Sequence, residues 1–530
     1  MGPIPQSWAE ALRSDPSTPI FGLAGSSNLR FLAQCRTNGA QVVQAQHEAG
    51  AVAMAAGWAE ATDSVGIASV HQGPGFTNAI TALVDAHRGW LPLLLLAGHT
   101  DNPQHHQRID TLALCDALGI AVVVPQTDHP RELDGLLLDA ARAKCPIVVL
   151  PPEPTSTRPH FHGPTETGLL DSLPEELVSR VSAGQRLALI AGRGAVRSNA
   201  LQAIHQLADH IDGLLLTTLP AHGAFAGNPR YAGSIGGFAT AGSTSALQSC
   251  DVVITFGAAL DDWSTAGGRV FGQDATVVRI DNHAPHHSAR FTTVLMDAAS
   301  AARQLHSRTS ARSTSEWAVS AAALARQARP RVKPAPGLDP RHLFDELNRL
   351  IPPQRRLVLD SGHFIALASM YLTTLHGPHL MFGQDFQSVG LGLARAIGAA
   401  CSRDSRLTVA VIGDGGAAMS LLELATVVDM RLPVIVIIVN DAAYGAEVHD
   451  FQPLGVDVSV AQSPLRDWAA VASALGARSH RVHSLHDLET LQDWLSDPQG
   501  PIVLDCLVNP EVDAVSVMTP EGVAEWSCAE

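Results

Sequence analysis

The chain has 530 residues, of which 46% are hydrophobic and only 16% charged, and its net charge is −16. At about 150 residues per domain this length predicts about three domains, and the composition excludes large-scale disorder. Negative charge without clusters of Lys and Arg argues against a nucleic-acid partner.

Short apolar runs alternate with helix-like stretches along the chain, which is typical of α/β domains with parallel sheets. The first series ends at the Pro-rich segment 151–166, the second ends before the Ser/Arg-rich segment 307–316, and the third follows a linker at 330–340. Such domains bind ligands at the carboxyl ends of their strands. We therefore expect three Rossmann-like open parallel-sheet domains, at residues 1–160, 180–310 and 335–530.

The N-terminus and the cysteines indicate in which cellular compartment the protein is expected. Residues 1–15 lack a basic segment leading into an apolar stretch, so no signal peptide is expected. The longest apolar runs, such as 432–439, are about half of the ~20 residues that span a bilayer. The seven cysteines are scattered without a CxxC pair, as expected of reduced thiols. The sequence thus predicts a cytoplasmic protein that does not associate with membranes.

Two acids follow two strand-like apolar runs of the third domain, with a predicted helix between the runs. If the strands are neighbours in a parallel sheet, Asp414 and Asp441 meet at one sheet edge, where carboxylates beside a phosphate suit Mg²⁺. Gly413, Gly415 and Gly416 would let a bulky anion approach the amides that start the helix. The alternative is that Asp414 only caps the helix and Asp441 only starts a loop.

This unit of strand, Gly-Asp-Gly turn, helix and strand resembles the diphosphate- and metal-binding motif of thiamine diphosphate (ThDP) enzymes, in its acetolactate synthase version. The resemblance implies ThDP and Mg²⁺ as cofactors. It makes Asp414 the first metal ligand and Asp441 the second, where the family usually has Asn. The carbonyl of Ala443 is implied as a further ligand, and Tyr444 and Gly445 as cofactor neighbours.

Two more segments of the third domain resemble the same family. In FGQDFQSVGLGLARAIGAA, the resemblance implies that the carbonyl of Gln387 contacts the aminopyrimidine ring and that Val389 supports the bent cofactor from below. The segment SGHFIAL is similar to a loop on the diphosphate side. It implies Gly362, His363 and Phe364 as cofactor neighbours.

The N-terminal domain carries matching signals. Glu48 opens a helix of mostly small apolar residues, and GPGFTN follows one strand later. Without the resemblance, Glu48 would be an ordinary acid near a helix N-terminus. The resemblance makes it the residue that bonds the aminopyrimidine ring and promotes its imino tautomer, and it implies Gly73 and Asn78 as parts of the cofactor cleft.

The resemblance implies decarboxylation of a 2-oxo acid, with the cofactor as electron sink. The leading hypothesis is an acetolactate synthase-like carboligase, which transfers the acyl carbanion to a second carbonyl or another acceptor. Ser26 and His71 fall where benzoylformate decarboxylase-like enzymes have a catalytic Ser and His, so release of an aldehyde stays open. His105 and His106 are further candidates, although such residues usually lie at the surface. A non-catalytic partner subunit is the remaining alternative.

Some positions depart from the acetolactate synthase branch. Ala258, Ala259 and Leu260 stand where that branch has an Arg near bound FAD, so FAD is doubtful. The segment EVHDFQPLGVD lacks the Trp that recognises the acceptor in branched-chain biosynthesis, and Val389 stands where Met is usual. The resemblance also implies a homodimer or homotetramer, with each active site between the N-terminal domain of one chain and the C-terminal domain of another.

Overall fold

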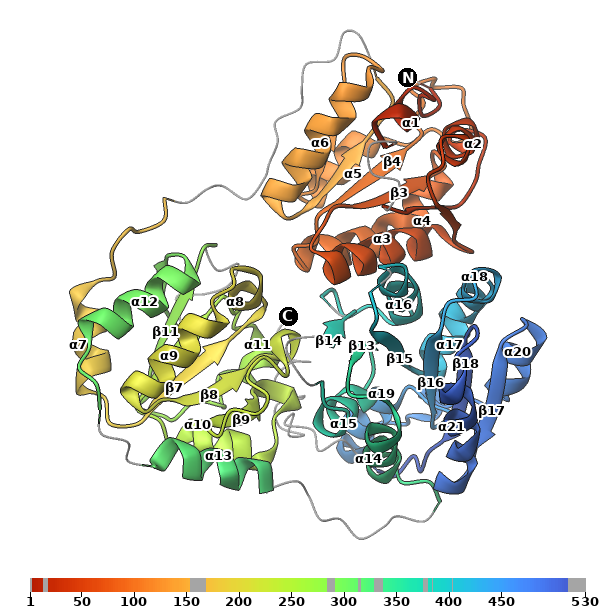
Figure 1. Cartoon of the computed structure of the whole chain (residues 1–530). Coiled ribbons are helices and arrows are strands. Elements are labelled where there is room, and N and C mark those ends of the chain that lie inside the picture. The colour runs from red at the N-terminus through yellow and green to blue at the C-terminus, as the bar shows by residue number, and fades with distance from the viewer. Residues whose placement is uncertain are drawn as a thin grey trace.

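The computed structural model describes residues 2–12, 18–152, 168–283, 291–312, 316–327, 337–374, 380–383, 385–402 and 404–512. The strands of these ranges form three six-stranded sheets that follow one another along the chain, and every strand pair is parallel (Figure 1). The predicted fold class of three Rossmann-like open parallel sheets is confirmed. The predicted domain limits stay a prediction.

The first sheet has the strand order β2-β1-β3-β4-β6-β5. Its strands are β1 (Ile20–Gly22), β2 (Val42–Gln44), β3 (Gly66–Val70), β4 (Leu93–Ala97), β5 (Ala121–Val123) and β6 (Pro146–Val149). Its helices are α1 (Trp8–Ala11), α2 (Leu29–Thr37), α3 (Glu48–Thr62), α4 (Pro74–Arg88), α5 (Thr111–Ala117) and α6 (Pro130–Ala143).

The second sheet has the order β12-β11-β10-β7-β8-β9, which is that of a dinucleotide-binding Rossmann fold. Its strands are β7 (Leu187–Ala191), β8 (Leu214–Thr217), β9 (Tyr231–Ser234), β10 (Val252–Phe256), β11 (Thr276–Asp281) and β12 (Thr292–Leu295). Its helices are α7 (Glu175–Ala183), α8 (Arg193–Arg197), α9 (Leu201–Ile211), α10 (Ala241–Gln248), α11 (Asp262–Thr265), α12 (Ala298–Arg308) and α13 (Trp317–Gln327). Although α13 lies beyond residue 310, it packs against β8 and β9.

The third sheet repeats the order of the first, as β14-β13-β15-β16-β18-β17. Its strands are β13 (Arg355–Leu359), β14 (Leu380–Phe382), β15 (Leu407–Gly413), β16 (Val434–Asn440), β17 (Arg478–Val482) and β18 (Ile502–Leu507). Its helices are α14 (Pro340–Leu350), α15 (Phe364–Tyr371), α16 (Gly392–Ala400), α17 (Asp414–Ser420), α18 (Leu424–Asp429), α19 (Gly445–Phe451), α20 (Trp468–Ala474) and α21 (Glu489–Ser496). A 3₁₀ turn, η4 (Leu421–Glu423), joins α17 to α18.

The central strands are buried along their whole length because helices cover both faces of each sheet. All seven residues of β16 are buried, and six of them are Val or Ile. A continuous β-branched run of this length is what a doubly covered parallel strand requires. Such strands fix the positions of the polar residues that follow them.

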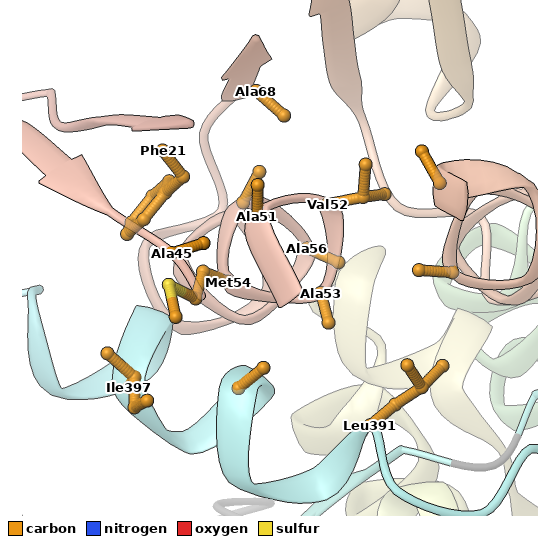
Figure 2. Packing of buried hydrophobic residues seen from close by; sticks show 14 of the residues in the cluster. Phe21, Ala45, Ala51, Val52, Ala53, Met54, Ala56, Ala68, Leu391 and Ile397 are labelled. Atoms are coloured by element: carbon orange, nitrogen blue, oxygen red, sulfur yellow. The ribbon is translucent and has the colours of Figure 1, made fainter. Parts of the chain in front are cut away.

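The first and third domains are joined by one apolar core. Helix α3, rich in Ala and Gly, packs against α16, and Figure 2 shows Met54 of α3 beside Ile397 of α16. Small side chains on both helices allow this close approach. The start of α3 is therefore held at a fixed place relative to the third sheet.

All three domains meet at a group of buried charges. Arg395 of α16 is 1% exposed and pairs with Glu60 and Asp85 of the first domain, at 3.3 and 3.1 Å. Asp385 pairs with Arg395 at 3.5 Å and with Arg193 of the second domain at 2.7 Å. This group is called the junction cluster below. Among the described residues, no helix is both long and apolar enough to cross a bilayer.

Candidate active site

The two predicted acids of the third domain do meet. Strands β15 and β16 are neighbours, and their pairing ends with Gly413 opposite Val439, so Asp414 and Asp441 leave the same sheet edge. Their carboxyl groups are in hydrogen-bonding contact. Burial and the charge of Asp441 raise the pKa of Asp414 to about 7, and burial also raises the pKa of Asp441.

This arrangement fits a divalent cation. Two buried carboxyls in contact favour a shared proton, and a hard cation in the same place would remove their repulsion. Among the described residues, no group of three or more His, Cys, Asp or Glu is arranged to hold a metal. Two carboxylates completed by carbonyl, phosphate and water oxygens are the ligand set that Mg²⁺ accepts. Ala443 is close by, since its amide donates to Asp441 Oδ1 at 3.2 Å, and its carbonyl stays a predicted ligand.

The glycine turn has two aromatic neighbours, Phe364 and Tyr444. A Cβ added to Gly413 would lie 3.1 Å from the ring of Phe364, and one added to Gly415 would lie 2.7 Å from the ring of Tyr444. A Cβ on Gly416 would overlap the Asp360 carboxylate. The two rings thus pack directly on the glycine turn, which only residues without a side chain allow.

His363 lies beside the acidic pair. Its Nε2 is 3.6 Å from Asp441 Oδ2, and its ring centre is 5.1 Å from that of His449. Burial, together with His449, lowers the pKa of His363 to about 4. The structure therefore gathers Gly362, His363 and Phe364 around the acids, with His363 neutral at physiological pH.

The segment that carries Gln387 and Val389 is fixed by an acid that the sequence analysis missed. Gln387 has a left-handed backbone, with φ of 56°. Directly after it, the amides of Gly390 and Gly392 donate to the wholly buried Asp360 at 3.0 and 3.1 Å. Burial raises the pKa of Asp360 to about 6, against the opposing effect of these amides. A strand-end Asp before SGHF was the available signal.

In the N-terminal domain, Glu48 starts α3 and is half-buried. The carboxamide of Asn78 donates to Glu48 Oε2 at 3.0 Å, so two predicted site residues are in direct contact. The Nδ1 of His47 accepts from the Ala49 amide at 3.1 Å and caps the helix. This cap and the buried helix body set the direction of the Glu48 side chain.

His71 is held by a different serine from the one predicted. It follows β3 next to the end of β1, which is the place where the strand order of this sheet reverses. Its Nδ1 lies 2.8 Å from the hydroxyl of Ser27, and its Nε2 lies 3.1 Å from Gln107 Oε1. The Ser27 amide also donates to Nδ1 at 3.3 Å, so Nδ1 is an acceptor, the Ser27 hydroxyl donates to it and the ring proton lies on Nε2.

Ser26 is placed differently from Ser27. It is exposed and lines a cavity of about 210 Å³ together with Gln72, His99 and His105. His106 is exposed and stacks on His105 at 4.9 Å between ring centres. Ser26 and His105 thus face a cavity next to the His71 network, whereas Ser27 is the residue in contact with the ring.

Comparison with known proteins places these features in a family. Family models of the thiamine pyrophosphate enzymes match all three domains: the N-terminal TPP binding domain at residues 6–119, the central domain at 174–305 and the C-terminal TPP binding domain at 360–506. The chain belongs to the ThDP-dependent enzyme family. The predicted recognition of this family is confirmed.

Relatives and a structural neighbour span nearly the whole chain. The chain is 24% identical to the acetolactate synthase isozyme 2 large subunit of Escherichia coli (strain K12), covering 98% of both chains. It is 26% identical to the isozyme 3 large subunit of the same organism, covering 89% of this chain and 88% of the relative. Its fold is similar to that of a ThDP-dependent 4-hydroxybenzoylformate decarboxylase of Rhodococcus jostii RHA1, with a TM-score of 0.79, 20% identity and coverage of 96% and 99%.

Proposed function

We propose that this ThDP-dependent enzyme also requires Mg²⁺, decarboxylates a 2-oxo acid and transfers the resulting acyl carbanion to an acceptor, in the manner of an acetolactate synthase-like carboligase. The observation that carries the proposal is the contact between Asp414 and Asp441 beside the glycine turn. A protein without cofactor chemistry would have no use for two buried carboxyls in contact, since their burial is costly.

Each residue has a defined task in this proposal. Asp414, Asp441 and the carbonyl of Ala443 hold Mg²⁺, and the turn at Gly415 binds the diphosphate. When bound, ThDP would supply an electron sink for the bonding electron pair that stays behind when the carboxylate leaves as CO₂. Glu48 exchanges a proton with the aminopyrimidine ring, and Asn78 orients the Glu48 carboxylate. The reaction has no net redox change, so it gives a flavin no chemical task.

We further propose a homodimer or homotetramer with active sites between the N-terminal domain of one chain and the C-terminal domain of another. Two apolar side chains next to the glycine turn support it. Met419 of α17 and Leu422 of η4 are 58% and 67% exposed in the single chain. Large exposed apolar side chains beside a site mark a surface that another chain covers.

Release of an aldehyde is the second candidate, and the His71 network favours it. A neutral imidazole with its proton fixed on Nε2 can deliver that proton to a carbon centre. An acceptor molecule and this proton would compete for the same reactive carbon. The two candidates therefore differ in which electrophile reaches that carbon first.

A product screen distinguishes these candidates. The protein with ThDP and Mg²⁺ is incubated with a panel of 2-oxo acids, with and without aldehyde, ketone or amine acceptors, and the products are identified by mass spectrometry. We expect ligated products that require an acceptor. Free aldehyde as the sole product would contradict the carboligase and support the decarboxylase. Absence of thermal stabilisation by ThDP with Mg²⁺ would contradict both and favour a non-catalytic partner subunit.

Replacing Asp441 by Asn tests the metal site. The amide keeps a ligating oxygen but removes one negative charge, so Mg²⁺ should bind about tenfold more weakly in the presence of ThDP. The measurement is a titration with Mg²⁺ in which the thermal stability of the protein is the readout. Asp457→Asn, which changes an exposed acid elsewhere, is the control. Equal Mg²⁺ midpoints for Asp441→Asn and the natural chain would show that this charge does not contribute.

A further inference from the structure

Glu423, a buried acid of the third domain, forms hydrogen bonds with the chain segment directly before Glu48. Glu423, the last residue of η4, is 3% exposed. Its Oε2 accepts from the Gln46 amide and its Oε1 from the His47 amide, each at 2.9 Å. Both carboxylate oxygens are thus used on two successive backbone amides, 376 and 377 residues away in sequence.

Thr426 forms two further hydrogen bonds with the same segment. One turn beyond Glu423, its hydroxyl donates to the Gln44 carbonyl at 2.6 Å and accepts from the Gln46 carboxamide at 3.3 Å. Glu423 and Thr426 therefore fix residues 44–47 from end to end. Glu48 is the next residue, and its backbone has no freedom independent of this segment.

The fit between the two elements is close. A Cβ on Gly50 would overlap the Glu423 carboxyl, so α3 can approach only because position 50 lacks a side chain. Among the described residues no cationic side chain forms an ion pair with Glu423. Its burial raises its pKa to about 7, and the two backbone amides act in the opposite direction. An acid kept here at that cost has a task that an apolar side chain would not perform.

We propose that Glu423 is a positioning residue for Glu48: through the amides of Gln46 and His47 it fixes where the Glu48 carboxylate stands. The inference rests on the proposed role of Glu48 at the aminopyrimidine ring. Glu423 belongs to the continuous stretch α17–η4–α18 that begins with Asp414. This stretch therefore carries a proposed metal ligand at its start and holds the segment before Glu48 farther along.

The test measures what Glu48 does, without a substrate. The C2 proton of bound ThDP exchanges with deuterium, and the rate reports the action of Glu48 in the presence of Mg²⁺. The rate is measured by NMR after quenching with acid. For Glu423→Gln we expect exchange about 10- to 100-fold slower, because displacement by about 1 Å has effects of this size. The affinity for ThDP should change less than about threefold, since no proposed diphosphate or metal ligand is altered.

A matched control lies on the same helix. Glu60, near the other end of α3, is also a partly buried acid at the contact with α16. Glu60→Gln should lower the thermal midpoint but leave C2 exchange within about twofold of the natural chain. In the cofactor-free protein, amide hydrogen exchange of a peptide covering residues 44–50 should quicken in Glu423→Gln and not in Glu60→Gln.

Each outcome decides between the two hypotheses. Glu48→Gln should slow C2 exchange more than any other variant, and normal exchange in it would remove the proposed role of Glu48 itself. Slow exchange in Glu48→Gln with normal exchange in Glu423→Gln would overturn the positioning role alone. If Glu423→Gln does not fold, Thr426→Val provides the same test, because it removes the hydrogen bonds of the Thr426 hydroxyl to Gln44 and Gln46. Normal exchange and unchanged peptide protection in that variant would also overturn the proposal.

Discussion

The amide and the hydroxyl of Ser27 together fix which nitrogen of His71 carries the proton, although the neighbouring Ser26 was the predicted residue. Ser26 and Ser27 are adjacent in a Gly/Ser loop, and their sequence context is nearly the same. Both line the same cavity, but Ser26 is exposed whereas Ser27 is buried with its hydroxyl against the imidazole. The loop conformation makes this distinction, and residue types alone do not reveal it.

Ser27→Ala should lower turnover about tenfold or more, since Nδ1 of His71 loses the shorter of its two hydrogen bonds to Ser27 and keeps only the one from the backbone amide. Binding of ThDP should not change. Steady-state rates on the substrate found in the product screen, together with ThDP titrations, check this expectation. A large loss of turnover in Ser26→Ala with none in Ser27→Ala would return the role to Ser26.

Asp360 predicts a pH dependence of stability. Its pKa is about 6 in the folded protein, above the usual value of 3.8, because of burial. The folded state therefore holds this proton more tightly than the unfolded chain, and the free energy of unfolding falls as pH rises through 6. Relative to that of Asp360→Asn, the free energy of unfolding of the natural chain should fall by about 1 kcal/mol between pH 5 and 7.

Urea unfolding of the cofactor-free protein at pH 5 and pH 7 measures this difference. Asp457→Asn is a suitable control, because the Ser459 amide lowers the pKa of Asp457 and its titration ends below this window. A constant difference between the natural chain and Asp360→Asn at both pH values would contradict the expectation. It would mean that Asp360 is ionised throughout.

At the scale of elements, the contact between α3 and α16 depends on missing side chains. A Cβ on Gly398 of α16 would overlap the Met54 carbonyl of α3. Gly398→Ala should therefore destabilise the protein by about 1–3 kcal/mol through overpacking. Thermal or urea unfolding measures this loss.

Gly135 provides the comparison. It lies in α6, where an added Cβ would meet no atom within 4 Å. Gly135→Ala should leave stability unchanged or raise it by up to about 1 kcal/mol through helix propensity. Similar losses in both variants would show that the contact between α3 and α16 is not the cause.

Elements also show how far the sequence could predict the site. The meeting of Asp414 and Asp441 was predictable, because two buried β-branched runs joined by one helix form neighbouring parallel strands. The contact of Glu423 was not, because its partners are backbone amides in another domain, and amides carry no sequence signal. Asp360 also binds backbone amides, those of Gly390 and Gly392, but its place at a strand end before SGHF was a signal that the sequence analysis did not use.

At the scale of the whole molecule, the junction cluster ties three domains together. Arg395→Met would leave Glu60, Asp85 and Asp385 without their shared cation in a buried place. We expect a loss of about 3–5 kcal/mol, as when one partner of a buried ion pair is removed. Calorimetry should show a lower first transition and separate unfolding of the domains.

An exposed ion pair serves as the control. Arg478 lies 3.9 Å from Asp493, and both side chains are well exposed. Arg478→Met should change stability by less than about 1 kcal/mol. A small effect of Arg395→Met, equal to that of Arg478→Met, would show that the domains are held by their apolar core alone.

The junction cluster also sets an order of events during synthesis. Asp85 leaves the ribosome 310 residues before Arg395, its partner. At about 5–20 residues per second, Glu60 and Asp85 are synthesised roughly 15 to 60 s before Arg395, with which they pair. During that time the apolar face of α3 has no α16 to cover it. We therefore expect chaperones to bind the nascent N-terminal domain during this interval, because exposed apolar surface is prone to aggregation.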